Sequence, residues 1–415
     1  MRTFYRYLLI FLICLIFPMN ACQQTSGTPI NTKPSETPIS SPTFTPAPLA
    51  TPTIDLLQKA HITEKCPNIL PTTDLPEIKA GGVIVFLKNS EMINIIRQAF
   101  LLNLANNEFF EFSQDGEIFS YYGIAVSPDR KTLAYSVDTL KDKTISLVLS
   151  NSMGERQKII PIKSDIPYPM YGGIQNWLND HQLILDRDVF NPYTGERQSF
   201  NPEDFPDISP DFYGIYSLEF DPTMTRVTYR SFGVTTALAD LASKNILSEL
   251  PGNSGPPEIA WLSDGNFLAI VKGTQKTELG NVAGEIFLID RNGKEIRQLT
   301  HLSTYYDRKY DLFNLSWSPD GTHLAFWQDE YNPNRKGLRL FVLDTKTEEL
   351  TSYCTWGEPT NVTFYGPIWS PDGRQLLIGD LSIKGTVRAV VIDTDKNIAI
   401  VAADDAIPVG WMATP

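Results

Sequence analysis

The pentapeptide Trp-Ser-Pro-Asp-Gly occurs twice in the chain, letter for letter, at Trp317–Gly321 and at Trp369–Gly373. Apolar segments precede and follow both copies. Ser-Pro-Asp-Gly is typical of a tight turn: proline sets φ at the second position, aspartate can bond its own backbone, and glycine accepts the left-handed conformation. We therefore interpret the pentapeptide as a hairpin connection between two strands, the first of which ends at the tryptophan, and not as a ligand or metal site.

Looser copies of the pentapeptide extend the pattern along the chain. They begin at Val126, Trp177, Phe220 and Trp261, and a truncated copy begins at Trp411. Successive copies start 51, 43, 41, 56, 52 and 42 residues apart. Each complete copy is followed by further apolar segments that are separated by polar turns. Four short strands in a repeat of this length are the sequence signature of a β-propeller blade.

The two ends of the repeat region complement each other. Residues 82–87, 99–105 and 109–112 supply three strands that lack an innermost strand, and Ala406–Trp411 supplies an innermost strand that lacks a blade. We predict that they form one shared blade, so that the C-terminal strand completes the N-terminal blade and leaves no open inner edge. The prediction is an all-β, seven-bladed propeller over residues 80–415. Six or eight blades are the alternatives, because the copies at Trp177 and Phe220 are weak.

The copies "WSPDG", "WLSDG" and "VSPDR" resemble the repeat of TolB-type propellers, which also occurs in the non-catalytic propellers of prolyl oligopeptidase-like peptidases. The resemblance covers about Ala80 to Pro415 and implies a propeller that works through the loops of one face. The chain departs from TolB in two ways. It has a Pro/Thr-rich segment in place of a leading α/β domain, and it is predicted to have one blade more than the six of TolB. TolB's partners are therefore not carried over.

The N-terminus has the pattern of a lipoprotein signal peptide. Arg2 and Arg6 precede the apolar run Leu8–Phe17, which is too short to span a bilayer. The residues that follow, Met19–Cys22, resemble a bacterial lipobox, which implies removal of residues 1–21 and a diacylglyceryl group on Cys22. An ordinary secretory signal with an incidental cysteine and an uncleaved membrane anchor are the alternatives.

Two more segments precede the predicted propeller. In residues 23–53, Thr, Pro and Ser supply 19 of 31 positions. This composition cannot bury enough apolar surface to fold, so residues 22–53 are predicted to be a lipidated, extended tether. Residues 54–79 are interpreted as an extension that leads into the propeller.

The cysteines and the charge limit the possible chemistry. In the predicted folded part only Cys66 and Cys354 remain, and an oxidising compartment favours a disulfide between them. Two separate, partly buried thiols are the alternative. No Cys/His spacing suggests a metal, and no cofactor motif is present. The formal net charge of −13 argues against binding of nucleic acid, which requires clustered basic residues.

Sequence motifs of enzymes are absent: there is no G-x-S-x-G elbow, no P-loop and no H-E-x-x-H. We therefore expect a non-catalytic binding or scaffolding module of the bacterial cell envelope. It would face the outside of the cytoplasm, contact the membrane through its lipid anchor only, and bind an envelope protein, a peptide or a glycan. The oligomeric state is not predicted. One alternative is an accessory or sensor subunit of an envelope transport system. Another is a propeller enzyme that acts on polysaccharide or peptidoglycan through the loop carboxylates Asp207, Asp211, Asp307 and Asp311.

Aromatic and acidic residues are concentrated in the segments that enter the innermost strands. These segments are expected to lie at one rim of the propeller. The segment His301–Phe313 is longer than blade packing needs, so its side chains are the first candidates for ligand contacts: Tyr305, Tyr306, Tyr310, Asp307 and Asp311. The further candidates are Trp356 and the tyrosines of a recurring Tyr-Gly pair, which form either a stacking platform or a structural ring: Tyr122, Tyr171, Tyr213 and Tyr365.

Overall fold

The computed structural model describes most of the predicted propeller in sixteen segments: 62–70, 82–89, 96–104, 106–114, 117–139, 144–162, 174–185, 188–200, 215–231, 236–250, 258–276, 282–305, 310–330, 338–354, 366–381 and 387–414. The chain divides into two units, Met1–Leu56 and Leu57–Pro415, and every described residue belongs to the second. Described secondary structure consists of strands and one short 3-10 helix, η3 (Leu302–Thr304). Within these segments, no helix is long and apolar enough to cross a bilayer.

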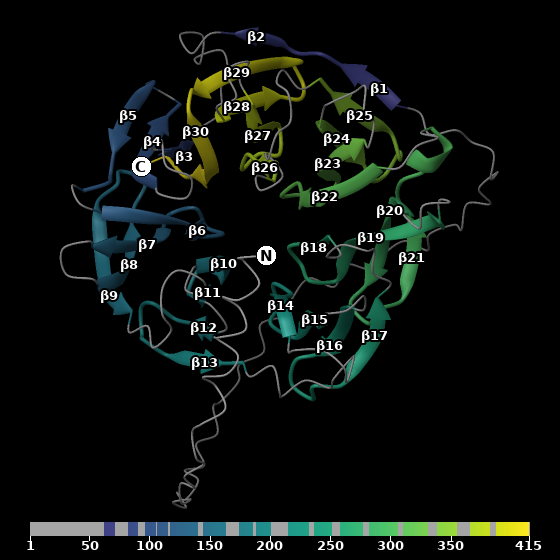
Figure 1. The fold of residues 1–415 in the computed structure, drawn as a ribbon, viewed down its shortest axis with the longest axis horizontal. Coiled ribbons are helices and arrows are strands. Elements are labelled where there is room, and N and C mark those ends of the chain that lie inside the picture. Colours follow the sequence, from purple (N-terminus) through teal and green to yellow (C-terminus); the bar gives the residue numbers. More distant parts are fainter. Residues whose placement is uncertain are drawn as a thin grey trace, which may run out of the picture. The chain divides into compact units, whose positions relative to one another are not determined.

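Seven four-stranded blades surround a central axis (Figure 1). From the innermost strand outward, the first four blades are β6 (Glu117–Val126), β7 (Leu133–Thr139), β8 (Thr144–Ser150) and β9 (Arg156–Ile162); β10 (Ile174–Asn179), β11 (Gln182–Leu185), β12 (Asp188–Phe190) and β13 (Arg197–Ser199); β14 (Ile215–Phe220), β15 (Arg226–Ser231), β16 (Thr236–Asp240) and β17 (Ile246–Leu250); and β18 (Ile259–Trp261), β19 (Phe267–Lys276), β20 (Val282–Asp290) and β21 (Glu295–Gln298).

The last three blades are β22 (Tyr310–Trp317), β23 (His323–Glu330), β24 (Leu338–Asp344) and β25 (Leu350–Tyr353); β26 (Ile368–Trp369), β27 (Gln375–Leu381), β28 (Val387–Asp393) and β29 (Ile398–Ala403); and β30 (Ala406–Met412), β3 (Val83–Asn89), β4 (Ile96–Asn103) and β5 (Glu108–Glu111). Blades are numbered in this order below. The prediction of seven blades is confirmed, and the six- and eight-bladed alternatives are wrong.

Blade 7 contains both ends of the propeller, as the sequence predicted. The C-terminal strand β30 is its innermost strand and pairs antiparallel with β3, with Trp411 opposite Ile84. Buried apolar side chains of β3 and β30 pack in the same two core clusters. The last strand of the chain therefore closes the ring.

The pentapeptide acts as the predicted turn. In the first exact copy, the Ser318 hydroxyl donates to Asp320 Oδ1 at 2.6 Å and the Gly321 N–H donates to the Ser318 carbonyl at 2.9 Å. The second copy repeats these two bonds at 2.6 and 3.0 Å. Gly321 and Gly373 have φ values of +68° and +72°, which is the left-handed region that favours glycine.

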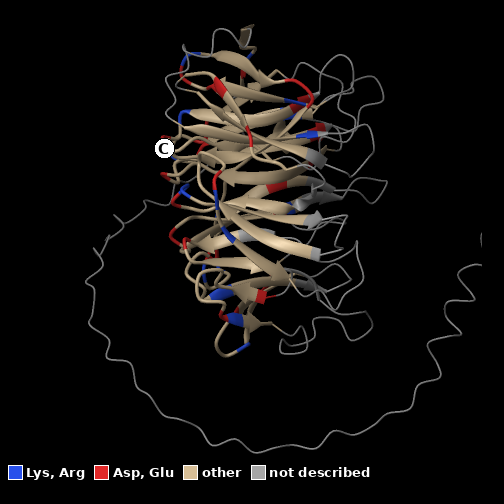
Figure 2. Ribbon diagram, turned by 90° about the vertical axis from the view of Figure 1, so that its left-hand side faces the viewer, with Lys and Arg blue, Asp and Glu red and all other residues tan. Residues whose placement is uncertain are grey.

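Antiparallel pairing places all these turns at one face of the propeller. We call it the turn face, and we call the opposite face, where the innermost strands begin, the loop face. Figure 2 shows the propeller from the side, with the C-terminus and the turn face at the left, where acidic and basic residues are interspersed.

The tryptophans that end the innermost strands link neighbouring blades. Four of the indole N–H groups donate, at 2.9–3.1 Å, to a carbonyl of the preceding blade: Trp177 to Ala125, Trp317 to Ala260, Trp369 to Ser316 and Trp411 to Ile368. In each case the acceptor is the residue just before the matching position of the repeat. Trp261 holds the same register, but its buried Nε1 has no hydrogen-bond partner. The prediction that the five tryptophans occupy equivalent positions is thus confirmed. The indole hydrogen bond between blades 3 and 4 is the one of the series that is absent.

This exception allows a matched comparison of two tryptophans. Trp317→Phe is expected to lower the free energy of unfolding by about 1 kcal/mol more than Trp261→Phe, because only the first substitution removes a made hydrogen bond. Both substitutions remove the same atoms, so the difference isolates the bond. Urea unfolding of the two variants measures it, and equal losses would contradict the assignment.

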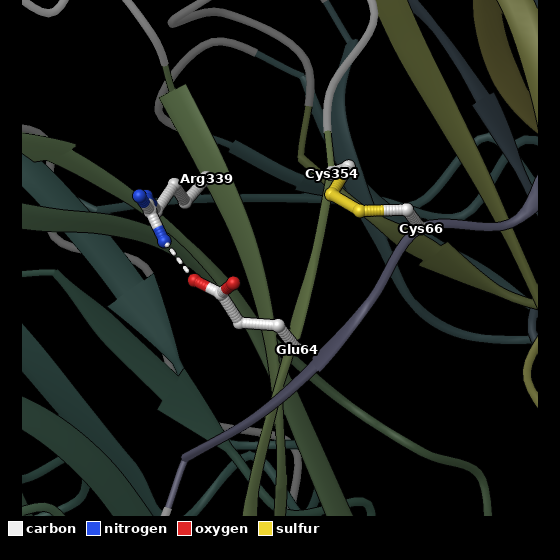
Figure 3. The surroundings of a disulfide bond; sticks show 4 residues. All are labelled: Glu64, Cys66, Arg339 and Cys354. Atoms are coloured by element: carbon white, nitrogen blue, oxygen red, sulfur yellow. Dashed lines mark hydrogen bonds and ion pairs between the residues drawn. A yellow bond between two sulfur atoms is a disulfide. The ribbon is translucent and has the colours of Figure 1, made fainter.

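A short segment ahead of the propeller binds to the outer edges of blades 5 and 6. Strand β1 (Ile62–Lys65) pairs parallel with β25, and β2 (Asn68–Leu70) pairs parallel with β29. Between them, Cys66 forms a disulfide with Cys354, with a Cα–Cα distance of 4.8 Å, and Arg339 donates to Glu64 at 2.9 Å (Figure 3). The disulfide prediction is confirmed. We call Ile62–Leu70 the strap.

Candidate functional site

The central channel is lined by the seven innermost strands. The residue just before each strand-ending position occupies equivalent places around it. Most of those whose side chains are described are small or apolar: Ala125, Ala260, Ser316, Ile368 and Gly410. The exception is Glu219, which is exposed although it lies on the innermost strand of blade 3, and so faces the channel. Among the described side chains of this ring, Glu219 is the one that can carry a charge.

A second glutamate approaches Glu219 from the next blade. Glu258 directly precedes β18, and its Oε2 accepts the backbone N–H of Asn314 in blade 5 at 2.9 Å. Many protein atoms lie around the Glu219 carboxyl, although part of its surface is accessible to solvent. The resulting desolvation is the larger cause that raises the pKa of Glu219 to about 7, and the like charge of Glu258 is the second cause. Desolvation also raises the pKa of Glu258, against the opposing effect of the Asn314 N–H. Two carboxyl groups of the channel are thus held in an environment that disfavours their charge.

Replacing Glu219 with glutamine is expected to raise the melting temperature at about pH 8 and to leave it unchanged near pH 4. The pKa of this carboxyl is about 7 in the folded protein and 4.5 ordinarily. The stabilising contribution of the protonated Glu219 carboxyl is therefore complete below pH 4.5 and is lost as the pH rises through about 7. Glutamine mimics the protonated form at every pH.

Scanning calorimetry across this pH range measures the effect. The matched control is Glu249→Gln, because Glu249 is an exposed carboxylate on the outermost strand of the same blade. A pH-independent difference between Glu219→Gln and the original protein would show that the channel does not perturb this group.

Blade 5 carries a second pair of acids, nearer the loop face. Asp311 on β22 lies directly opposite Asp329 on β23. Desolvation, followed by the charge of Asp311, raises the pKa of Asp329. Asp311 was a candidate from the sequence, whereas Asp329 was missed. A signal was present in the sequence: Asp329 is the second-last residue of the strand "HLAFWQDE", which begins after the pentapeptide turn and therefore ends at the loop face.

One buried carboxylate holds both described ends of the segment His301–Phe313. Glu285 on β20 is fully buried and accepts four hydrogen bonds, from the Thr300 hydroxyl at 2.6 Å, the Leu302 N–H at 3.0 Å, the Ser303 N–H at 2.6 Å and the Tyr310 hydroxyl at 3.2 Å. Tyr310 is itself fully buried, so it is a core residue of blade 5 and not an accessible ligand contact. Tyr305 is exposed, at 46% of its surface, and remains a candidate.

Of the other sequence candidates, all but Tyr122 lie outside the described residues. Those that lie outside the described residues are Tyr171, Tyr213, Tyr306, Tyr365, Trp356, Asp207, Asp211 and Asp307. Tyr122 belongs to β6, but its side chain is not described. Cys22 and residues 1–61 are likewise outside the described part. No group of three or more His, Cys, Asp or Glu that could hold a metal ion occurs among the described residues.

Comparisons with known proteins show a similarity of fold. No family model matches the chain, and no curated protein matches its sequence. Among solved structures it is similar to TolB from Acinetobacter baumannii, with 15% identity, coverage of 80% of this chain and 67% of that chain, and a TM-score of 0.44. A protein from Lactobacillus plantarum shares 12% identity over 81% of this chain and 100% of that chain, with a TM-score of 0.51.

A third similar structure is an oligogalacturonate lyase in complex with manganese, with 12% identity, coverage of 78% and 86%, and a TM-score of 0.50. The similar structures thus include an enzyme. At these identities the likeness shows the β-propeller fold and leaves the activity open.

Proposed function

We propose that the protein is a lipid-anchored, non-catalytic binding module of the bacterial cell envelope that holds a basic segment of a partner protein or peptide at the central channel. The observation that carries this proposal is the pair Glu219 and Glu258. Within the part of the chain that the structure describes, neither carboxylate forms an ion pair, and each is disfavoured in its charged form. A lysine or arginine side chain between them would stabilise both charges at once.

The surroundings of this pair suit a docking surface. The ring is closed by β30, so the channel wall is pre-organised and loses little entropy on binding. Asp311 and Asp329 extend the acidic surface toward the loop face, where Tyr305 is exposed. A net charge of −13 also attracts a basic partner over long range.

Two features support a location outside the cytoplasm. The disulfide is a bond that persists in oxidising compartments. The lipobox-like Met19–Cys22 would supply the anchor, and residues 23–53 would supply a tether between the membrane and the propeller. Labelling of cells with an alkyne analogue of palmitate tests the anchor: the label is expected in the original protein and not in Cys22→Ser.

The binding proposal is tested by capture from native membranes with the full-length protein. Partners captured through the channel are expected to be lost with Glu219→Gln combined with Glu258→Gln, and to be weakened with Tyr305→Ala combined with Tyr306→Ala. Glu249→Gln serves as the charge-matched control. Capture that is indifferent to the channel variants would refute the proposal. A captured transporter component would identify the protein as an accessory subunit of that system.

A glycan-active enzyme is the second candidate, and the pKa of Glu219 is the observation that favours it. A carboxyl group that titrates at about 7 can act as a general acid or base near neutral pH. Incubation with polysaccharides and peptidoglycan, followed by measurement of new sugar ends, separates the two functions. Cleavage that disappears in Glu219→Gln would establish the enzyme.

A further inference from the structure

A cavity of about 390 Å³ lies at the turn-face end of the channel, apart from the carboxylates of blades 3 and 4. Its lining comes from blades 1, 6 and 7 and consists of Ile124, Ala125, Val126, Ser127, Pro128, Arg130, Ile368, Trp369, Val409, Gly410 and Trp411. Blades 1 and 6 are not neighbours, so their residues can share a cavity only near the axis. The volume is within the range of sites for small molecules, about 300–1,000 Å³.

The walls of this cavity are mixed: polar surface and one cationic side chain lie beside the partly exposed apolar side chains of Ile124, Val126, Ile368 and Val409. Trp369 and Trp411 donate their indole N–H groups to the Ser316 and Ile368 carbonyls and are buried, so they support the lining from behind and offer it little ring surface. The one ionisable residue of the lining is Arg130, in the turn that follows β6.

Arg130 stands where the exact copies of the repeat have glycine. Its φ is +63°, close to the +68° and +72° of Gly321 and Gly373, and this conformation is disfavoured for residues with a side chain. Met224 in blade 3 shares the substitution, with a φ of +55°, but does not line the cavity. The backbone conformation alone therefore does not mark a site. The combination of strain, charge and cavity occurs at Arg130.

The charge of Arg130 is poorly compensated. Across the described segments, its guanidinium takes part in no hydrogen bond and no ion pair. Desolvation lowers the pKa of Arg130, and the charge of Asp372 offsets this only in part. Asp372 forms no ion pair with the guanidinium within the described segments, and its Oδ1 accepts the Ser370 hydroxyl at 2.6 Å and the Arg374 N–H at 3.2 Å. An anion in the cavity would supply the missing partner.

We infer that this cavity is a binding site for a small organic anion with an apolar body, such as an arylalkyl carboxylate. The carboxylate would pair with the Arg130 guanidinium, whose planar fork accommodates two oxygens. The apolar body would lie against Ile124, Ile368 and Val409, which line the cavity and are partly exposed. The site is independent of the basic segment proposed for the channel carboxylates, because none of those acids lines it.

Isothermal titration calorimetry of the full-length protein in detergent, with 3-phenylpropionate as probe, tests the inference. The uncharged 3-phenylpropanol and the cationic 2-phenylethylamine are the controls. Saturable binding of the carboxylate is expected, with affinity at least tenfold above that of either control. No saturation, or equal affinity for the three probes, would overturn the inference.

Two glycine variants keep the test independent of folding. Arg130→Gly restores the residue of the exact repeats, so it is expected to fold with an equal or higher melting temperature and to bind 3-phenylpropionate at least tenfold more weakly. Met224→Gly makes the same backbone change in blade 3 and is expected to bind like the original protein. Arg130→Lys, which keeps the charge without the planar fork, is expected to fall between them. Undiminished binding by folded Arg130→Gly would refute the site.

Discussion

A chain that ends at residue 405 is expected to lose most of its thermal stability. The deletion removes β30, the innermost strand of blade 7, and with it the buried side chains of Ile407, Trp411 and Met412. Burial of a large apolar side chain contributes about 1.5–3 kcal/mol. The loss is therefore on the order of 5–10 kcal/mol, which approaches the total stability of an ordinary folded protein. Circular dichroism during heating measures it.

The ends of the strand supply the control for this deletion. Thr414 and Pro415 lie beyond β30, so a chain that ends at Ala413 retains the strand and the hydrogen bond from the Ala413 N–H to the Arg130 carbonyl. The protein with this shorter deletion is expected to have the same melting temperature as the intact protein. If the chain that ends at residue 405 also melted unchanged, the C-terminal strand would not be what closes the ring.

The architecture could be read from the sequence because one short turn repeats in register. Trp317–Gly321 and its copies fix both the hairpin and the residue that ends each innermost strand, and the unmatched strands at the two ends fix the closure. The strap could not be predicted in the same way. Its strands are four and three residues long, "ITEK" and "NIL", and carry no alternation. They are strands because β25 and β29 offer them an edge, which is a tertiary cause.

The candidate site was less accessible to sequence reasoning. Asp311 was found because it lies in a long acidic and aromatic segment, but its partner Asp329 comes from the adjacent strand. Glu219 precedes Phe220 in one of the weak repeats, and alignment of that position across the blades would have shown one carboxylate among small residues. The approach of Glu258 is different. It depends on how far blade 4 is rotated from blade 3, which no spacing within one blade encodes.

Replacement of both Cys66 and Cys354 with alanine is expected to lower the free energy of unfolding by about 2–5 kcal/mol. The bond joins residues 288 positions apart, so it restricts the unfolded chain strongly. It also holds the strap against blades 5 and 6, where β1 and β2 each pair with an outermost strand. Without it, strands of three and four residues have little to keep them in place, so the strap should detach before the blades unfold.

Hydrogen exchange and melting separate these two consequences. Strap amides of Ile62–Lys65 should exchange faster in the double variant, whereas those of β27 in the buried part of blade 6 should change only with the global stability. Glu64→Gln is the matched control, because it removes the exposed Arg339 ion pair of the same strap, which is worth less than about 1 kcal/mol. A reducing agent should lower the melting temperature of the original protein to that of the double variant and leave the variant unaffected. If reduction left the original protein unchanged, the disulfide would not stabilise the ring, and the strap would have to be held by its strand pairing alone.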